Sequence, residues 1–191
     1  MNYRPGVDDH GLPHDPFKSC TVPRPIGWLS TVSANQTCNL APFSQWKNLT
    51  FDPPMVMYAA NQNIWGQRID SVFNAEDTGW FVWNMATYKL RESVNISAMA
   101  VDPEIDEFEL AGVEKGSCIE APGPSVKESP IQFECKYLST TRFPGRTPVG
   151  TVDVVFGEVL RIHIDEKALT DDGRVYILGI KPIARMGYYD Y

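Results

Sequence analysis

Short apolar runs separated by polar turn sequences recur along this chain of 191 residues. Residues 26–32, 55–60 and 80–85 are rich in β-branched, aromatic and other apolar side chains, and turn-forming residues bound them. Residues 39–44 continue the pattern after a turn at 33–36, although Pro42 interrupts them. Runs of this length and composition are typical of buried β-strands.

Two later segments predict longer strands. In residues 131–137 the apolar side chains alternate with Gln132, Glu134 and Lys136, which is typical of an antiparallel strand with one face in water. Residues 152–165 form the longest predicted strand, and Gly157 within it predicts a bulge or a barrel corner. The apolar positions in register along this strand are Val154, Phe156, Leu160, Ile162 and Ile164.

Helical signals are few. Asp70 or Ser71 can begin a short helix that Gly79 ends, and Thr87 can begin a second helix over 88–100. Residues 102–109 hold five acidic side chains with apolar ones between them. This segment is interpreted as a solvated surface segment with apolar anchors.

About six strands with few helices indicate a mainly β fold. The 15 prolines and 14 glycines are scattered, which suits a chain with many turns. A closed or nearly closed antiparallel barrel would leave few exposed strand edges. No linker or repeat divides the chain, so one domain is predicted over 1–191, with 1–22 as an irregular N-terminal arm.

The composition indicates which classes of binding partner are disfavoured. A net charge of −7 disfavours nucleic acid and anionic membrane surfaces, because both attract basic patches. The sequence contains neither an apolar segment long enough to span a membrane nor an apolar signal core, and a cytoplasmic protein is expected. The four cysteines form no CxxC pair, and Pro13 separates His10 from His14, so no metal site is predicted.

Common catalytic motifs are absent. The chain has no GxxxxGK[ST] or GxGxxG phosphate loop, and no HExxH or GxSxG motif. With three histidines, two of them in the N-terminal arm, no catalytic side chain is assigned. Any redox chemistry would therefore need a bound cofactor.

Three blocks in a fixed order carry a resemblance to a known family. They are PRPIGWLSTV at 23–32, NLAPFS at 39–44, and Asp52-Pro53-Pro54 before MVMY. In these blocks the chain resembles the flavin reductase-like, FMN-binding split-barrel proteins, and further matches extend the resemblance over roughly 23–189. It implies an antiparallel Greek-key split β-barrel with peripheral helices, and a homodimer that binds FMN in a groove between its subunits.

The resemblance also implies which residues contact the flavin. Hydroxyl groups, the backbone next to Pro42 and aromatic side chains would hold the ring, and the start of the helix at 70 would hold the phosphate. The family has Lys-Asp-Thr where this chain has Ile69-Asp70-Ser71, so Arg68 or Arg24 would supply the positive charge. The predicted cofactor-binding residues are Arg24, Pro25, Trp28, Ser30, Thr31, Val32, Asn39, Ala41, Pro42, Phe43, Ser44, Asn48, Arg68, Asp70, Ser71, Asn74 and Arg185.

The implied activity is oxidoreduction, with NAD(P)H as the electron donor to FMN and a small molecule as substrate or electron acceptor. Three alternatives stay open on the sequence. One is a non-catalytic FMN-binding electron-transfer protein, and another is a flavin-dependent oxygenase or reductase of a small organic substrate, with 102–109 near the ligand pocket. The third is a barrel that binds a different apolar ligand and no flavin.

Overall fold

The computed structural model describes the whole chain, residues 1–191. Its main feature is a seven-stranded antiparallel sheet with the order β3-β2-β6-β9-β10-β5-β4. The strands are β2 (Gly27–Val32), β3 (Cys38–Phe43), β4 (Trp46–Phe51), β5 (Pro54–Asn61), β6 (Trp80–Asn84), β9 (Ile131–Phe143) and β10 (Val152–Ile164).

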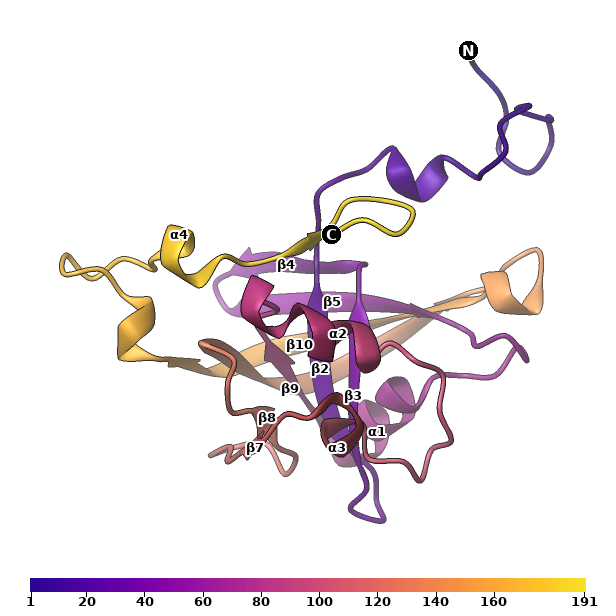
Figure 1. Cartoon of the computed structure of the whole chain (residues 1–191). Coiled ribbons are helices and arrows are strands. Elements are labelled where there is room, and N and C mark those ends of the chain that lie inside the picture. Colours follow the sequence, from indigo (N-terminus) through magenta and orange to yellow (C-terminus); the bar gives the residue numbers. More distant parts are fainter.

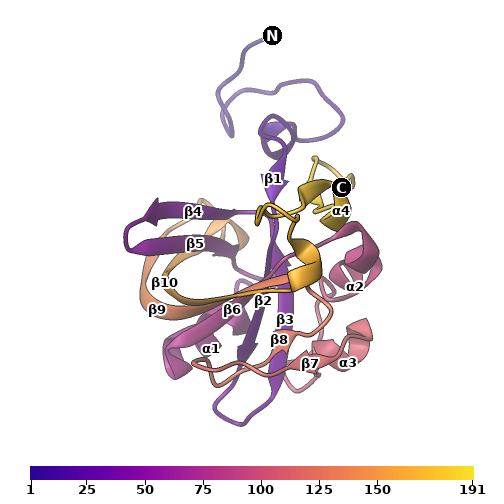
Figure 2. The same ribbon diagram turned by 90° about the vertical axis from the view of Figure 1, so that its left-hand side faces the viewer.

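The sheet curls so that its two edges approach each other (Figures 1 and 2). The edge strand β3 leads directly into β4 at the opposite edge, and the N–H of Ala59 in β5 donates to the carbonyl of Gln45 between them at 2.9 Å. The predicted mainly β fold, an antiparallel split barrel, is confirmed.

Short elements surround the barrel, and none of the helices is long and apolar enough to cross a bilayer. Two small sheets pair β1 (Arg24–Pro25) with β11 (Ala184–Arg185) and β7 (Lys115–Gly116) with β8 (Ser125–Val126). The helices are η1 (Phe17–Ser19), α1 (Asp70–Thr78), η2 (Tyr88–Leu90), α2 (Arg91–Ile96), α3 (Glu107–Ala111), η3 (Pro148–Gly150), η4 (Glu166–Ala168) and α4 (Ile177–Ile180).

Two hydrophobic cores lie on the two sides of β2, all six residues of which are buried. Inside the barrel, Leu29 packs with side chains of β5, β6, β9, β10 and α1. On the other side, Trp28 packs with residues of β3, α2 and α3, and this second cluster is the outer core. Both helices lie on that side of β2 and β3 in Figure 2. Because both faces of β2 are covered, the small polar residues of this strand are buried as well.

Most predicted elements exist, but the second helix is shorter than predicted. Residues 88–100 form η2 followed by α2, which ends at Ile96. The Ser97 hydroxyl donates to the Val94 carbonyl at 3.0 Å and accepts from the Trp28 indole at 2.9 Å. These bonds hold Ser97 in the outer core, and the chain then leaves the helix.

The interpretation of 102–109 as a solvated segment is wrong for its second half. Asp106 caps α3 by accepting the Phe108 N–H at 3.0 Å, and the side chains of Glu107 and Phe108 are buried. The apolar anchor is therefore a helix that packs on β3.

The predicted water-facing side of β9 is also wrong. Gln132 and Glu134 are both buried, and the Gln132 amide donates to the carbonyls of Val126, in β8, and Ser129, just after it. The Glu134 carboxylate accepts backbone N–H groups of Ile119, Glu120 and Ala121 at 2.9, 2.6 and 2.7 Å. Buried polar side chains thus fix this covering loop to the sheet.

In β10 the side chains that are buried are not the ones that the sequence pattern predicted to be buried. Asp153, Val155, Gly157 and Val159 are buried, whereas the predicted apolar row is half-buried or exposed. The bulge predicted at Gly157 is confirmed by a register shift between Phe156 and Gly157. The N-terminal arm contains η1 and otherwise no helix or strand, and it projects away from the barrel (Figures 1 and 2).

Candidate functional site

A cavity of about 450 Å³ opens beside the end of the edge strand β3. The strand β3 is the last of the sheet on this side, and four of its residues line the cavity. The lining residues are Asn39, Ala41, Pro42, Phe43, Gln62, Asn63, Ile64, Trp65, Gln67, Arg68, Ile69, Asp70, Ser97, Ala98, Met99, Ala100, Val101, Asp102, Pro103, Glu107 and Val149.

A buried hydrogen-bond network centred on Asn39 forms the floor of the cavity. The Asn39 amide donates to Glu107 Oε1 at 2.8 Å, and the Leu40 N–H donates to Glu107 Oε2 at 3.2 Å. The Ser71 hydroxyl donates to Asn39 Oδ1 at 2.7 Å. A fully satisfied network of this kind fixes β3, α1 and α3 relative to one another.

The same network continues below the floor. The Thr31 hydroxyl donates to Asn39 Oδ1 at 3.2 Å, and the Asn74 amide donates to Thr31 Oγ1 at 3.1 Å. Thr31, Ser71 and Asn74 are buried. Their polar groups form hydrogen bonds within this network, and the three residues lie beneath the cavity without lining it.

Acidic side chains dominate the charge of the cavity. Asp70, Asp102 and Glu107 line it, and Arg68 is the single basic residue among the lining side chains. Burial raises the pKa of the Asp70 carboxyl and of the Glu107 carboxyl. Both shifts indicate surroundings that disfavour further negative charge.

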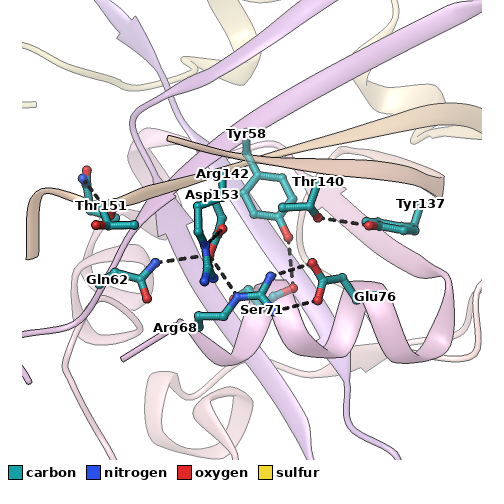
Figure 3. A network of polar contacts seen from close by, with 11 residues as sticks. Tyr58, Gln62, Arg68, Ser71, Glu76, Tyr137, Thr140, Arg142, Thr151 and Asp153 are labelled. Atoms are coloured by element: carbon teal, nitrogen blue, oxygen red, sulfur yellow. Dashed lines mark hydrogen bonds and ion pairs between the residues drawn. The ribbon is translucent and has the colours of Figure 1, made fainter. Parts of the chain in front are cut away.

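Arg68 is fully engaged with two carboxylates (Figure 3). Its two terminal nitrogens donate to Glu76 at 2.9 and 2.6 Å, and its Nε donates to Asp153 at 3.0 Å. Its charge is thus neutralised, and the side chain anchors the segment 62–70 to β10 and α1.

Asp153 is the buried centre of this network. Its side chain is 1% exposed and also accepts Arg142 Nε at 2.8 Å and Gln62 Nε2 at 3.2 Å. Despite the opposing effect of burial, these bonds lower the pKa of Asp153 from 3.8 to about 2. Asp153 therefore stays ionised and holds the cavity wall in place from the barrel side.

A tight turn at 63–67 presents an exposed tryptophan at the cavity. The Asn63 side chain accepts the N–H groups of Trp65 and Gln67 at 3.0 and 2.9 Å, and Gly66 adopts a positive φ of 74°. Trp65 is 70% exposed and lines the cavity beside Ile64. The turn residues Asn and Gly were a signal for this loop, but its position at the cavity depends on the Arg68 anchor.

A second pocket of about 420 Å³ lies next to the small sheet of β1 and β11. A pocket of about 180 Å³ has Pro42 and Ala98 in common with the lining of the cavity, and Ser44 and Arg185 in common with the lining of the second pocket. The second pocket is lined by Asp15, Phe17, Lys18, Ser19, Arg24, Ser44, Arg185 and Tyr188.

The predicted site residues thus divide into groups. The cavity brings together Asn39, Ala41, Pro42, Phe43, Arg68 and Asp70. The second pocket contains Arg24, Ser44 and Arg185. Thr31, Ser71 and Asn74 lie directly beneath the floor.

The remaining predicted residues lie away from both pockets. Trp28 is fully buried in the outer core, so its ring forms no wall of the cavity, contrary to the prediction. The Ser30 hydroxyl donates to the Pro124 carbonyl at 2.6 Å, and Val32 belongs to the outer core. Pro25 and Asn48 are exposed on β1 and β4.

Sequence reasoning missed much of the cavity wall. The segments 62–67 and 97–101 had no catalytic signature, and Glu107 lay in a segment interpreted as solvated. The resemblance pointed to a position near the ligand pocket for the acidic stretch, and Asp102, Pro103 and Glu107 do line the cavity.

The cavity fits a flavin ring better than it fits a phosphate. Its volume is within the usual range for cofactor sites, and Phe43, Trp65 and Ile69 supply apolar or aromatic walls. At the start of α1, however, Asp70 is acidic, Arg68 is neutralised and the Ser71 hydroxyl is buried. The phosphate position predicted there therefore has no free cation.

Comparisons with known proteins agree with this fold. A family model described as "Flavin reductase like domain" matches residues 19–179. An "Uncharacterized protein" of Aquifex aeolicus is 35% identical over 170 residues, which cover 88% of this chain and 84% of that protein.

Two solved structures have the same fold. Nitrilotriacetate monooxygenase component B from Bacillus cereus superposes with a TM-score of 0.90 at 25% identity, covering 100% of this chain and 94% of that one. The 2-nitrobenzoate 2-nitroreductase NbaA of Pseudomonas fluorescens superposes with a TM-score of 0.79 at 24% identity, covering 92% and 82% of the two chains.

Proposed function

The chain belongs to the flavin reductase-like family, and from this premise we propose that it is an FMN-binding oxidoreductase that takes electrons from NAD(P)H. The observation that carries the proposal is the cavity at the edge of β3, beside the NLAPFS block. When bound there, FMN supplies the hydride and electron chemistry that none of the protein's own motifs provides.

The side chains of the cavity are suited to holding a planar ring. Phe43 and Ile69 give apolar contact, and Trp65 lies in the middle of the hydrogen-bonded turn at 63–67, where it can cover an aromatic ligand. Alignment of two rings is the main requirement for hydride transfer, so positioning side chains suffice and no acid or base is assigned. The hydrogen bonds around Asn39 and Asp153 keep these walls in place.

We also propose that two copies of the chain associate through the outer face of β10. Leu160, Ile162 and Ile164 are exposed in alternate positions of this strand, in the part that extends past its pairing with β5 and pairs with β9 alone. Contiguous exposed apolar side chains of this kind usually mark an interface. A second copy is the proposed occupant, because the family resemblance that covers this strand implies a homodimer with the flavin between its subunits.

The activity is tested by anaerobic titration of the FMN-loaded protein with NADH and, separately, NADPH. Loss of the visible flavin absorption within seconds supports the proposal, and the faster donor identifies the dinucleotide. A protein that keeps FMN but is reduced by neither donor contradicts the reductase activity and favours an electron-transfer protein. The small-molecule electron acceptor and the cytoplasmic location stay predictions.

A further inference from the structure

The charge of the cavity at the edge of β3 determines which small molecules it can admit. Three carboxylates line it, those of Asp70, Asp102 and Glu107, and none of them takes part in an ion pair. The one basic residue of the lining, Arg68, is neutralised by two carboxylates that lie outside the lining. The cavity therefore carries uncompensated negative charge.

Two of these carboxylates belong to the cavity wall. Asp70 begins α1 and is half-buried, and Glu107 is buried in the first turn of α3. The groups that donate to Glu107, the Asn39 amide and the Leu40 N–H, are neutral. Burial raises the pKa of the Glu107 carboxyl, and the negative charge of Asp70 raises it further, so the two carboxylates repel each other. A bound cation would reduce this repulsion.

The third carboxylate and an aromatic ring lie at the solvent side of the cavity. Asp102 is exposed between α2 and α3, and Trp65 is 70% exposed in the turn at 63–67. Tryptophan attracts cations better than the other aromatic side chains do, and quaternary ammonium ligands are recognised by such rings. The cavity thus combines negative charge with the aromatic surface that cationic ligands favour.

The remaining lining favours an organic cation over a metal ion or an anion. Phe43, Ile69 and Met99 give the cavity apolar surface, and its volume of about 450 Å³ suits an aromatic molecule. The acidic side chains form no cluster that could hold a metal ion. An anion would approach three carboxylates without meeting a free cation, which is electrostatically unfavourable.

We propose that the electron acceptor of this protein is an aromatic organic cation, which Asp70, Asp102 and Trp65 select at the cavity. This proposal rests on the proposed function, in which electrons from NAD(P)H pass through the flavin to a small molecule. With a quinone as acceptor, NAD(P)H is oxidised by loss of a hydride. The quinone receives the two electrons and two protons, one derived from the hydride and one from water, and becomes a hydroquinone.

Calorimetric titration with three small probes tests the charge preference of the cavity. The probes are phenyltrimethylammonium, benzyl alcohol and benzenesulfonate, which share a phenyl ring and differ in charge. At about 0.15 M salt, exposed charges far from the cavity are largely screened. The FMN-loaded protein is expected to bind the cation at least about tenfold more tightly than the neutral alcohol, and the sulfonate more weakly than the alcohol.

Two substitutions remove single charges from the cavity with little change in side-chain size. Asp70→Asn and Asp102→Asn are each expected to bind phenyltrimethylammonium about fivefold more weakly and to bind benzyl alcohol like the wild type. Because Asp102 is exposed, its variant should fold normally even if α1 is disturbed in the other. Asp77→Asn is the matched control, since Asp77 is an exposed carboxylate of α1 that does not line the cavity.

Turnover with two quinones tests the electron acceptor. Oxidation of NADH or NADPH by the FMN-loaded protein is followed with a naphthoquinone that carries a trimethylammonium group and with one that carries a sulfonate. The value of kcat/KM is expected to be at least about tenfold higher for the cationic quinone. Asp102→Asn should reduce this ratio, whereas Asp77→Asn should not.

The outcomes separate the cation site from the proposed function. Benzenesulfonate or benzyl alcohol binding as tightly as phenyltrimethylammonium, or an equal loss in Asp77→Asn and the cavity variants, overturns the cation site. A sulfonated quinone that is reduced as efficiently as the cationic one overturns the acceptor class. If the protein takes up no FMN, or if neither dinucleotide reduces it, the proposed function fails, while titration of the same three probes into the protein without flavin still decides the charge preference.

Discussion

Asp153 shows how a single residue can determine the shape of the cavity wall. Its buried carboxylate holds Arg68, Arg142 and Gln62, and Arg68 carries the wall segment. Asp153→Asn leaves the partly exposed Arg68 and the exposed Arg142 without their charged acceptor and is expected to lower the free energy of unfolding by about 2 kcal/mol. Urea unfolding measures this loss, and FMN binding is expected to weaken with it.

The effect of Asp153 has a defined pH dependence. Its pKa falls on folding from 3.8 to about 2, so its stabilisation is fully present above pH 3.8 and is lost as the pH falls through about 2. The difference in stability between wild type and Asp153→Asn should therefore shrink in acid. The exposed Asp172, which pairs with Arg174, is the control: Asp172→Asn should cost no more than about 0.5 kcal/mol. A constant difference from neutral to strongly acid pH would contradict the assignment.

Trp65 gives a second prediction for one side chain. Because its ring is 70% exposed, Trp65→Ala should leave the melting temperature nearly unchanged. FMN binding should weaken about tenfold, since an aromatic contact of about 1 kcal/mol or more is lost. Phe51→Ala, which removes a ring that is 92% exposed on β4, is the control. Equal FMN affinity in the Trp65→Ala variant and the wild type would mean that the turn at 63–67 does not contact the flavin.

Sequence reasoning located several residues of the cavity but not the role of each. The NLAPFS block contributes Asn39, Ala41, Pro42 and Phe43 to the lining of the cavity, and their contact with the flavin stays a prediction. Arg68 was predicted to meet a phosphate and instead pairs with Glu76 and Asp153. Ion pairs across distant segments have no sequence signal, so the neutralisation of this arginine was not predictable.

At the scale of an element, the bulge in β10 leaves no room for a side chain at Gly157. A Cβ atom at Gly157 would lie 2.5 Å from the Phe81 ring and 3.2 Å from the Lys136 carbonyl oxygen. Gly157→Ala is expected to cost about 2 kcal/mol of unfolding free energy through overpacking. In a Phe81→Leu background the same substitution should cost less, because the ring is gone. Chemical denaturation of the four proteins checks this, and additive effects would contradict the clash.

The elements that were mispredicted share one physical cause. Periodicity identifies strands, but it cannot say which face the rest of the chain will cover. Glu134 is buried because a loop donates three N–H groups to it, and the predicted apolar row of β10 faces outward because Val155 and Val159 fill the barrel. Tertiary packing therefore determines which face of each strand is buried, and the local sequence pattern does not.

At the scale of the whole molecule, the outer face of β10 predicts association. Leu160→Glu combined with Ile162→Glu places charges at positions that are 48% and 51% exposed in one subunit. The subunit fold should survive, whereas a dimer that buries this face should dissociate. Light scattering after gel filtration measures the mass, with Leu110→Glu on α3 as the control. A wild-type protein that is monomeric, or a double variant that stays dimeric, would contradict this interface.

The barrel was more predictable than the cavity. Alternation and turn residues predict a closed or nearly closed antiparallel barrel, and the resemblance carried by the three ordered blocks makes it a split barrel. The cavity requires segments 62–70 and 97–103 to meet at the edge of β3, and buried side chains such as Glu107 and Asp153 hold them there. Contacts between segments so far apart in the sequence leave no local pattern from which they can be predicted.

The most direct test of the account is the visible absorption spectrum of the protein after incubation with excess FMN and desalting. The cavity and the family together predict flavin bands that elute with the protein and differ in position or shape from those of free FMN. A colourless protein that cannot be loaded with FMN would contradict the account, and the barrel would then bind a different ligand.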